Sequence, residues 1–229
     1  MRYQYLLLDN DNTVMDFSAA EAKALIDLLA FFDLPTDEKT VHTYQELNEA
    51  LWKALERGET TQPKLKVERF RQLLEVLGRT DIAPEDMAAK YTTMLASHPD
   101  LLPGAEEFIC ALQGKVKMAI VSNGLSAIQR GRLGLCPLTP MFDAIVISEE
   151  VGVAKPDPKL IEVALDMLGC KDKSQAVMMG DSLSADIKAA VNAGVDSIFF
   201  SPKGVESDLP TYTVHSHEEA LKILMEEQI

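Results

Sequence analysis

Short apolar runs bounded by small or polar residues recur along the chain, first near its beginning and again after residue 100. Runs of this kind are typical of strands buried in a sheet. Strands are predicted at residues 3–8, 116–121, 144–147, 176–179 and 197–200, with an edge strand at 212–214. Helices are predicted between and after them, at residues 106–112, 127–133, 158–168, 186–193 and 218–225. This alternation predicts βαβ units and a parallel sheet.

The strand pattern disappears between residues 19 and 96, where apolar residues recur at steps of three and four. Ala22, Leu25 and Leu29 show this spacing, which is typical of an amphipathic helix. Three further helices are predicted, at residues 44–55, 70–77 and 84–94. Four such helices can form a small antiparallel bundle, and about eighty residues are too many for a loop inside a compact domain. We therefore predict two domains, a core of residues 1–16 and 99–229 and an inserted helical cap of residues 17–98.

Polar side chains follow four of the predicted strands. Asp9 and Asp11 come after the first strand, Ser122 after the second, Lys155 after the third and Asp181 after the fourth. The carboxyl ends of parallel strands lie on one edge of a sheet, where ligands bind. We therefore expect these side chains to converge, although about 170 residues of chain separate the first from the last.

Asp9 and Asp11 are two positions apart, so they would share a face if the chain is extended there. Two carboxylates in this arrangement can hold a hard cation, and they can also act as a nucleophile and an acid/base. An ordinary turn rich in Asp and Asn is the alternative for this segment taken alone. The matching segments after the later strands favour the chemical interpretation.

The order of these residues resembles the haloacid dehalogenase-like (HAD) superfamily of phosphohydrolases. Residues 9–13 are similar to its DxDx[TV] motif and residues 180–186 to its GDxxxxD motif, with Ser122 and Lys155 in the expected order between them. The resemblance implies an α/β fold, a Rossmann-like parallel sheet flanked by helices with an inserted four-helix cap. Short stretches near residues 16–21 and 52–58 resemble the pyrimidine 5′-nucleotidase branch.

The resemblance also implies roles for the matching residues. Asp9 would be the nucleophile that forms an aspartyl phosphate, and Asp11 would protonate the leaving group and later activate water. Mg²⁺ would be bound by Asp9, Asp181 and the backbone carbonyl of Asp11. Asp186 would orient Lys155 or the waters bound to the metal.

Phosphate binding is expected from Ser122, Asn123 and Lys155. The lysine would offset the negative charge of the carboxylates and the ester, while the serine hydroxyl and nearby backbone N–H groups would donate hydrogen bonds to phosphate oxygens. Asp11 also bears on the type of reaction, because the dehalogenases of this superfamily lack a carboxylate at that position. Phosphate chemistry is therefore favoured over dehalogenation.

The substrate is expected to be a small phosphorylated metabolite, and its specificity is expected to lie in the cap. Asn48, Trp52 and Arg69 are the candidates for contacts with the leaving group, which we predict to be a pyrimidine nucleoside. Phosphoglycolate, a sugar phosphate or a sugar-phosphate mutase reaction stay open as alternatives. A non-catalytic regulatory protein on the same fold is a different class, and the intact set of polar residues argues against it.

Composition limits the partners. The 229 residues carry a net charge of −14, with no cluster of Lys and Arg, so a nucleic acid polymer is not expected. Three separated cysteines form no zinc-binding pattern and favour a reducing compartment. No apolar run is long enough to span a membrane, and a cytoplasmic location is expected. The sequence does not distinguish a monomer from a homodimer.

Overall fold

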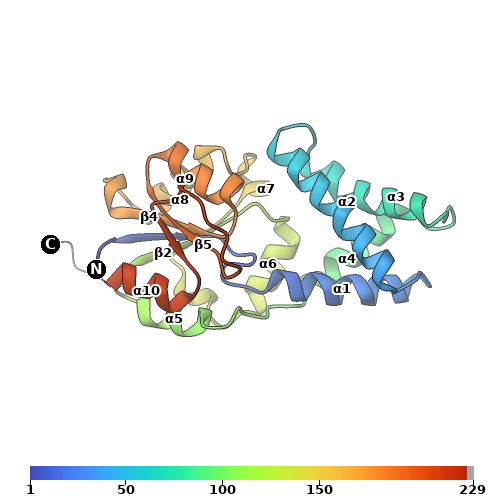
Figure 1. Ribbon diagram of the computed structural model, residues 1–229, viewed down its shortest axis with the longest axis horizontal. Helices are drawn as coiled ribbons and strands as arrows, with labels where there is room; N and C mark the ends of the chain where they lie inside the picture. Colours follow the sequence, from blue (N-terminus) through green and yellow to red (C-terminus); the bar gives the residue numbers. More distant parts are fainter. Residues whose placement is uncertain (226–229) are drawn as a thin grey trace.

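The computed structural model describes residues 1–225 and contains a six-stranded sheet covered by helices, with a helical bundle at one end (Figure 1). The strands are β1 (Tyr5–Leu8), β2 (Lys117–Ser122), β3 (Ala144–Ile147), β4 (Ala176–Gly180), β5 (Asp196–Phe200) and β6 (Tyr212–Val214). All neighbouring strands are parallel, in the order β3-β2-β1-β4-β5-β6. This is the strand order of a Rossmann-like sheet, and the predicted fold class is confirmed.

Helices cover both faces of the sheet. They are α5 (Ala105–Leu112), α6 (Ser126–Leu135), α7 (Ser148–Val151), α8 (Pro158–Leu168), α9 (Lys188–Ala193) and α10 (His217–Met225). Leu6 and Leu8 of β1 pack on the side of α5 and α10, whereas Leu7 packs on the side of α8 and α9. All three leucines are fully buried, which explains why this strand is apolar on both faces. None of the helices described has the length and apolar character needed to cross a membrane.

The bundle consists of α1 (Phe17–Phe31), α2 (Glu38–Glu56), α3 (Gln62–Val76) and α4 (Pro84–Leu95). Its centre contains three aromatic rings, with Phe70 5.6 Å from Tyr44 and 5.3 Å from Tyr91 between ring centroids. Helix α1 begins before the first apolar position of its predicted pattern, Ala22. The reason is a helix cap, because the Asp16 carboxylate accepts a hydrogen bond from the Ala19 backbone N–H at 2.9 Å.

Two chain segments connect the bundle to the sheet, and they lie side by side. The Asp16 N–H donates to the Asp100 carbonyl, and the Leu102 N–H donates to the Val14 carbonyl. Helix α6 approaches the second segment so closely that a Cβ at Gly131 would lie 2.6 Å from the Cβ of Ala96, which only glycine avoids. The division into core and cap domains at residues 16/17 and 98/99 stays a prediction.

Candidate active site

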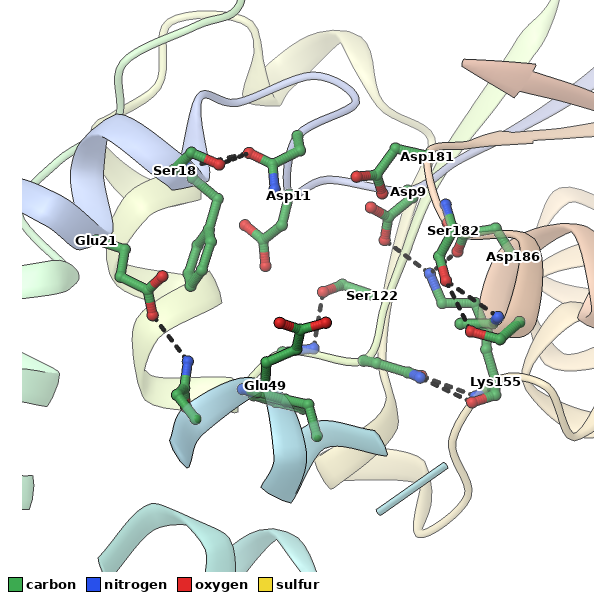
Figure 2. Close-up of a pocket in the computed structure, with 18 of the residues that line it drawn as sticks. Asp9, Asp11, Ser18, Glu21, Glu49, Ser122, Lys155, Asp181, Ser182 and Asp186 are labelled. Atoms are coloured by element: carbon green, nitrogen blue, oxygen red, sulfur yellow. Dashed lines mark hydrogen bonds and ion pairs between the residues drawn. The ribbon is translucent and has the colours of Figure 1, made fainter. Parts of the chain in front are cut away.

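A cavity of about 970 Å³ lies between the carboxyl ends of the strands and the helical bundle (Figure 2). All ten residues selected from the sequence line it: Asp9, Asp11, Asn48, Trp52, Arg69, Ser122, Asn123, Lys155, Asp181 and Asp186. A volume of this size suits a small metabolite. The structure therefore brings the selected residues together, while their chemical roles stay predictions.

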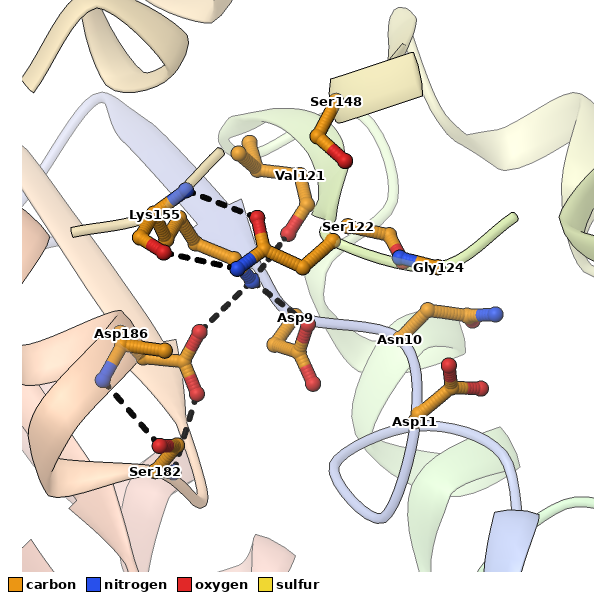
Figure 3. Close-up of polar contacts among 12 residues, drawn as sticks. Asp9, Asn10, Asp11, Val121, Ser122, Gly124, Ser148, Lys155, Ser182 and Asp186 are labelled. Carbon is orange, nitrogen blue, oxygen red and sulfur yellow. Dashed lines mark hydrogen bonds and ion pairs between the residues drawn. The ribbon is translucent and has the colours of Figure 1, made fainter. Parts of the chain in front are cut away.

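Lys155 is the positive centre of the sheet side of the cavity. Its Nζ lies 2.7 Å from Asp9 Oδ1 and 2.6 Å from Asp186 Oδ1, and it donates to the Val121 carbonyl at 2.6 Å (Figure 3). The lysine is only 1% exposed. Burial lowers the pKa of Lys155, but the charges of Asp186 and Asp9 outweigh this effect and the net pKa is raised. Lys155 is therefore held as a cation beside the Asp9 carboxylate.

Three carboxylates gather around that single lysine. Oxygen atoms of Asp9, Asp181 and Asp186 all lie within 4.8 Å of one another. Asp186 reaches this position because residue 180 is glycine, where a Cβ would lie 2.3 Å from the Asp186 carboxylate. The Ser182 N–H also donates to Asp186 at 3.0 Å. Asp186 thus contacts Lys155, one of the two partners considered for it, and is also close to the other two carboxylates.

The carboxylates outnumber the cation, and their pKa values reflect this. Burial, followed by the charge of Asp186, raises the pKa of Asp181 to about 7. Burial also raises the pKa of Asp9 well above its usual value, although Lys155 opposes the shift. The surplus of negative charge and the oxygen donors fit a small divalent cation such as Mg²⁺.

Ser122 is the last residue of β2 and Asn123 follows it, at the edge of the cavity. The Ser122 Oγ accepts the Gly124 N–H at 2.9 Å, so its hydroxyl proton is available for another acceptor. The Asn123 side chain is already used, because it donates to the Lys155 carbonyl and accepts the Lys155 N–H, both at 2.8 Å. A contact between Asn123 and phosphate would therefore come from its backbone N–H.

Asp11 is held by two buried residues of α6. Gln129 donates to Asp11 Oδ2 at 2.7 Å, and Arg132 forms an ion pair with Asp11 Oδ1. Arg132 also donates to the carbonyl of His98, in the second connecting segment. Burial raises the pKa of Asp11 although Arg132 opposes the shift, which suits a carboxyl that gains and loses a proton.

The opposite end of the cavity belongs to the bundle. Asn48 donates to Glu21 Oε1 at 2.9 Å and accepts from Arg69 Nη1 at 3.3 Å. Tyr91 donates to the same Glu21 oxygen at 3.3 Å. Trp52 lines this part of the cavity and is partly exposed.

Several polar residues in the cavity or next to it were not among the candidates, and four of them contact candidate residues: Glu21, Gln62, Gln129 and Arg132. Gln62, at the start of α3, donates to the Asn123 carbonyl at 2.8 Å and to Ser148 Oγ at 2.9 Å, so it joins the bundle to the sheet side. The one signal in the sequence was that Gln129 and Arg132 lie three apart in a predicted helix. Because both residues are polar, the sequence did not indicate that this face of the helix is buried.

Comparison with known proteins gives consistent results. The profile of the family described as haloacid dehalogenase-like hydrolases matches residues 6–200. The pyrimidine 5′-nucleotidase PynA of Streptococcus pneumoniae is 34% identical, covering 98% of this chain and 96% of PynA. The pyrimidine 5′-nucleotidase YjjG of Escherichia coli is 31% identical, covering 98% of this chain and 99% of YjjG.

Solved structures agree. The HAD-hydrolase YfnB of Bacillus subtilis, crystallised with bound magnesium, superposes with a TM-score of 0.91 at 33% identity, covering 98% of this chain and 99% of YfnB. That crystal structure is described as revealing interdomain movement. An L-2-haloacid dehalogenase superposes with a TM-score of 0.77 at 18% identity, a similarity of fold alone.

Proposed function

The chain belongs to the haloacid dehalogenase-like hydrolase family, and we propose that it is a magnesium-dependent 5′-nucleotidase acting on pyrimidine nucleoside monophosphates. It is a phosphatase of the HAD type. The substrate class is supported by two full-length relatives named as pyrimidine 5′-nucleotidases.

One observation supports this proposal above the others. A single cavity has the Asp9–Lys155 ion pair on the sheet side, while Asn48, Trp52 and Arg69 line it from the bundle. A phosphate at the first end would leave room for a nucleoside at the second. The bundle would then act as a cap that selects the leaving group.

The proposed reaction has two steps. Asp9 attacks the phosphorus atom of the ester while Asp11 donates a proton to the leaving nucleoside oxygen. Water then attacks the phosphoryl group on Asp9, and Asp11 accepts the proton from that water. The raised pKa of Asp11 supports this exchange, because the carboxyl must be protonated in the first step and ionised in the second.

Neighbouring residues neutralise the negative charge around the transferred phosphoryl group. Lys155 offsets the negative charge of Asp9 and of the phosphate, and Ser122 donates its free hydroxyl proton to a phosphate oxygen. Asp9, Asp181 and the backbone carbonyl of Asp11 would bind Mg²⁺, which neutralises phosphate charge and aligns the ester. Asp186 keeps the ammonium of Lys155 in place.

Removal of the metal is expected to abolish activity. Exhaustive chelation should stop phosphate release, and added Mg²⁺ should restore it. The activity restored by Ca²⁺ should be at least about tenfold lower than that restored by Mg²⁺. Ca²⁺ prefers longer bonds and more ligands, so it would displace the phosphate from Asp9. Phosphate release measured at matched free-ion concentrations tests this. Full activity after chelation would remove the metal from the proposal.

A comparison of substrates tests the proposed function. UMP, dUMP and dTMP should have higher kcat/KM than hexose phosphates or phosphoglycolate, because stacking of a base on Trp52 is worth roughly 1–3 kcal/mol. Released inorganic phosphate is the readout, and it also distinguishes a phosphatase from a mutase. If a sugar phosphate or phosphoglycolate exceeds every nucleotide by more than about tenfold, roughly 1.4 kcal/mol, the nucleotidase proposal fails while the phosphatase assignment stands.

A further inference from the structure

Arg69 carries a buried charge with too few partners. Its side chain is 2% exposed, yet its one well-formed hydrogen bond within the described residues is the 3.3 Å contact from Nη1 to Asn48, with the Tyr44 hydroxyl as a further, looser contact. Nε and Nη2 are buried without any hydrogen-bond partner in that part of the chain. The rings of Tyr91 and Phe70 lie 4.7 and 5.0 Å from the guanidinium carbon. The aromatic faces and the loose contact with Tyr44 compensate only part of the cost of burying such donors, so Arg69 can still accommodate a further acceptor.

Glu21, a negatively charged hydrogen-bond acceptor, lies near Arg69. Its Oε1 accepts hydrogen bonds from Asn48 and Tyr91, while Oε2 accepts none from residues 1–225. Burial raises the pKa of Glu21, and the nearby charge of Arg69 opposes the shift. Figure 2 shows Glu21 across the cavity from Lys155 and Asp186, at the end where a leaving group would lie.

Asn48 lies between Glu21 and Arg69 and forms a hydrogen bond with each of them. Its amide nitrogen faces Glu21 and its amide oxygen faces Arg69, so it joins an acceptor to a donor through one rigid amide. A ligand that satisfies both groups must present an acceptor to Arg69 and an N–H to Glu21. An anionic ligand would satisfy Arg69, but the Glu21 carboxylate would repel it. A neutral group with adjacent C=O and N–H is the better match.

We infer that Glu21 and Arg69 together recognise the imide edge of a uracil or thymine ring, with Arg69 donating to the O4 carbonyl and Glu21 accepting the neighbouring N3–H. This inference rests on the proposed function and specifies its substrate class. Cytosine has the reverse pattern, because its amino group would face Arg69 and its ring nitrogen lone pair would face Glu21. Both protein groups would then be left unsatisfied.

The wild-type protein provides the first test. UMP should exceed CMP in kcat/KM by about 10²-fold, because a site built to bind an N–H strongly disfavours a ligand that lacks it. UMP methylated at N3 should fall to about the level of CMP, since the methyl group replaces the hydrogen that Glu21 accepts. CMP within about threefold of UMP would overturn the inference and leave the nucleotidase proposal intact. If neither nucleotide is hydrolysed while a sugar phosphate is, the proposed function itself fails.

Glu21→Gln provides the second test. The amide keeps the size of the side chain and an oxygen for Asn48 and Tyr91, and it presents an N–H to the ligand in place of Oε2. The ratio of kcat/KM for UMP to that for CMP should fall at least tenfold, with the midpoint of thermal unfolding checked in parallel. Glu75→Gln is the matched control, because Glu75 is an exposed residue of α3 that pairs with Arg71 and does not line the cavity, and its ratio should equal that of the wild type. An unchanged ratio in a folded Glu21→Gln protein would overturn the inference.

Discussion

Replacing Asp9 with asparagine is expected to lower kcat for phosphate release by about 10⁴-fold or more in a protein that stays folded. An amide keeps the shape of the side chain but cannot become an acyl phosphate. Loss of a covalent nucleophile typically costs on the order of 10⁴–10⁶ in rate. The fold should persist because Lys155 retains its contacts with Asp186 and with the Val121 carbonyl.

Asp27→Asn is the matched control for this variant. This variant makes the same Asp-to-Asn change at an exposed position of α1, and its activity should equal that of the wild type. Circular dichroism and a phosphatase assay on both proteins provide the comparison. Substantial turnover by a folded Asp9→Asn protein, shown by mass spectrometry to be free of deamidation, would contradict the nucleophile assignment.

Asp11→Asn should lower kcat on UMP by roughly 10²–10⁴-fold, the contribution expected from general acid–base catalysis. The loss in the rate of leaving-group release, measured in the first turnover before hydrolysis of the intermediate limits the reaction, should be much smaller with p-nitrophenyl phosphate. Its leaving group departs without a proton, so the first step no longer needs the acid. Rates of leaving-group release across a series of aryl phosphates of increasing leaving-group pKa measure this dependence.

The structure indicates how this variant should be controlled. Gln129 can still donate to the amide oxygen that replaces the carboxylate, whereas Arg132 loses its ion pair and keeps its hydrogen bond to the His98 carbonyl and its contact with the Phe17 ring. A lower midpoint of thermal unfolding is therefore expected and must be measured beside the kinetics. An equal loss of the release rate for good and poor leaving groups would argue against Asp11 as the general acid.

The sheet was predictable because its signals are local. Residues 144–147 and 212–214 were predicted as strands, and the structure has β3 and β6 with those bounds. Asp9 and Asp181 follow predicted strands closely, so a parallel sheet was enough to place them at one edge. The pairing of β1 with β4 joins segments far apart in the chain, and no local pattern specifies it.

The bundle side of the cavity was only partly predictable. Arg69 was a candidate, but its position beside Phe70 gave no sign that the guanidinium is buried among aromatic rings. Glu21 lies in a helix that was predicted from the spacing of its apolar residues. Its hydrogen-bond partners, however, come from α2 and α4. Contacts among three helices depend on how they pack, and a single sequence does not contain that information in local form.

The most direct test of the proposed function is detection of a phosphoryl group on Asp9. The Asp11→Asn variant is suited to this, because p-nitrophenyl phosphate can form the intermediate while its hydrolysis lacks the base. The reaction is quenched in acid during the burst of p-nitrophenol, and peptides are analysed by mass spectrometry. We predict that the peptide containing Asp9 gains the mass of one phosphoryl group, and that the Asp9→Asn/Asp11→Asn double variant shows neither burst nor gain. A burst matching the enzyme concentration with no phosphoryl group on Asp9, or with one on another residue, would contradict the proposed mechanism.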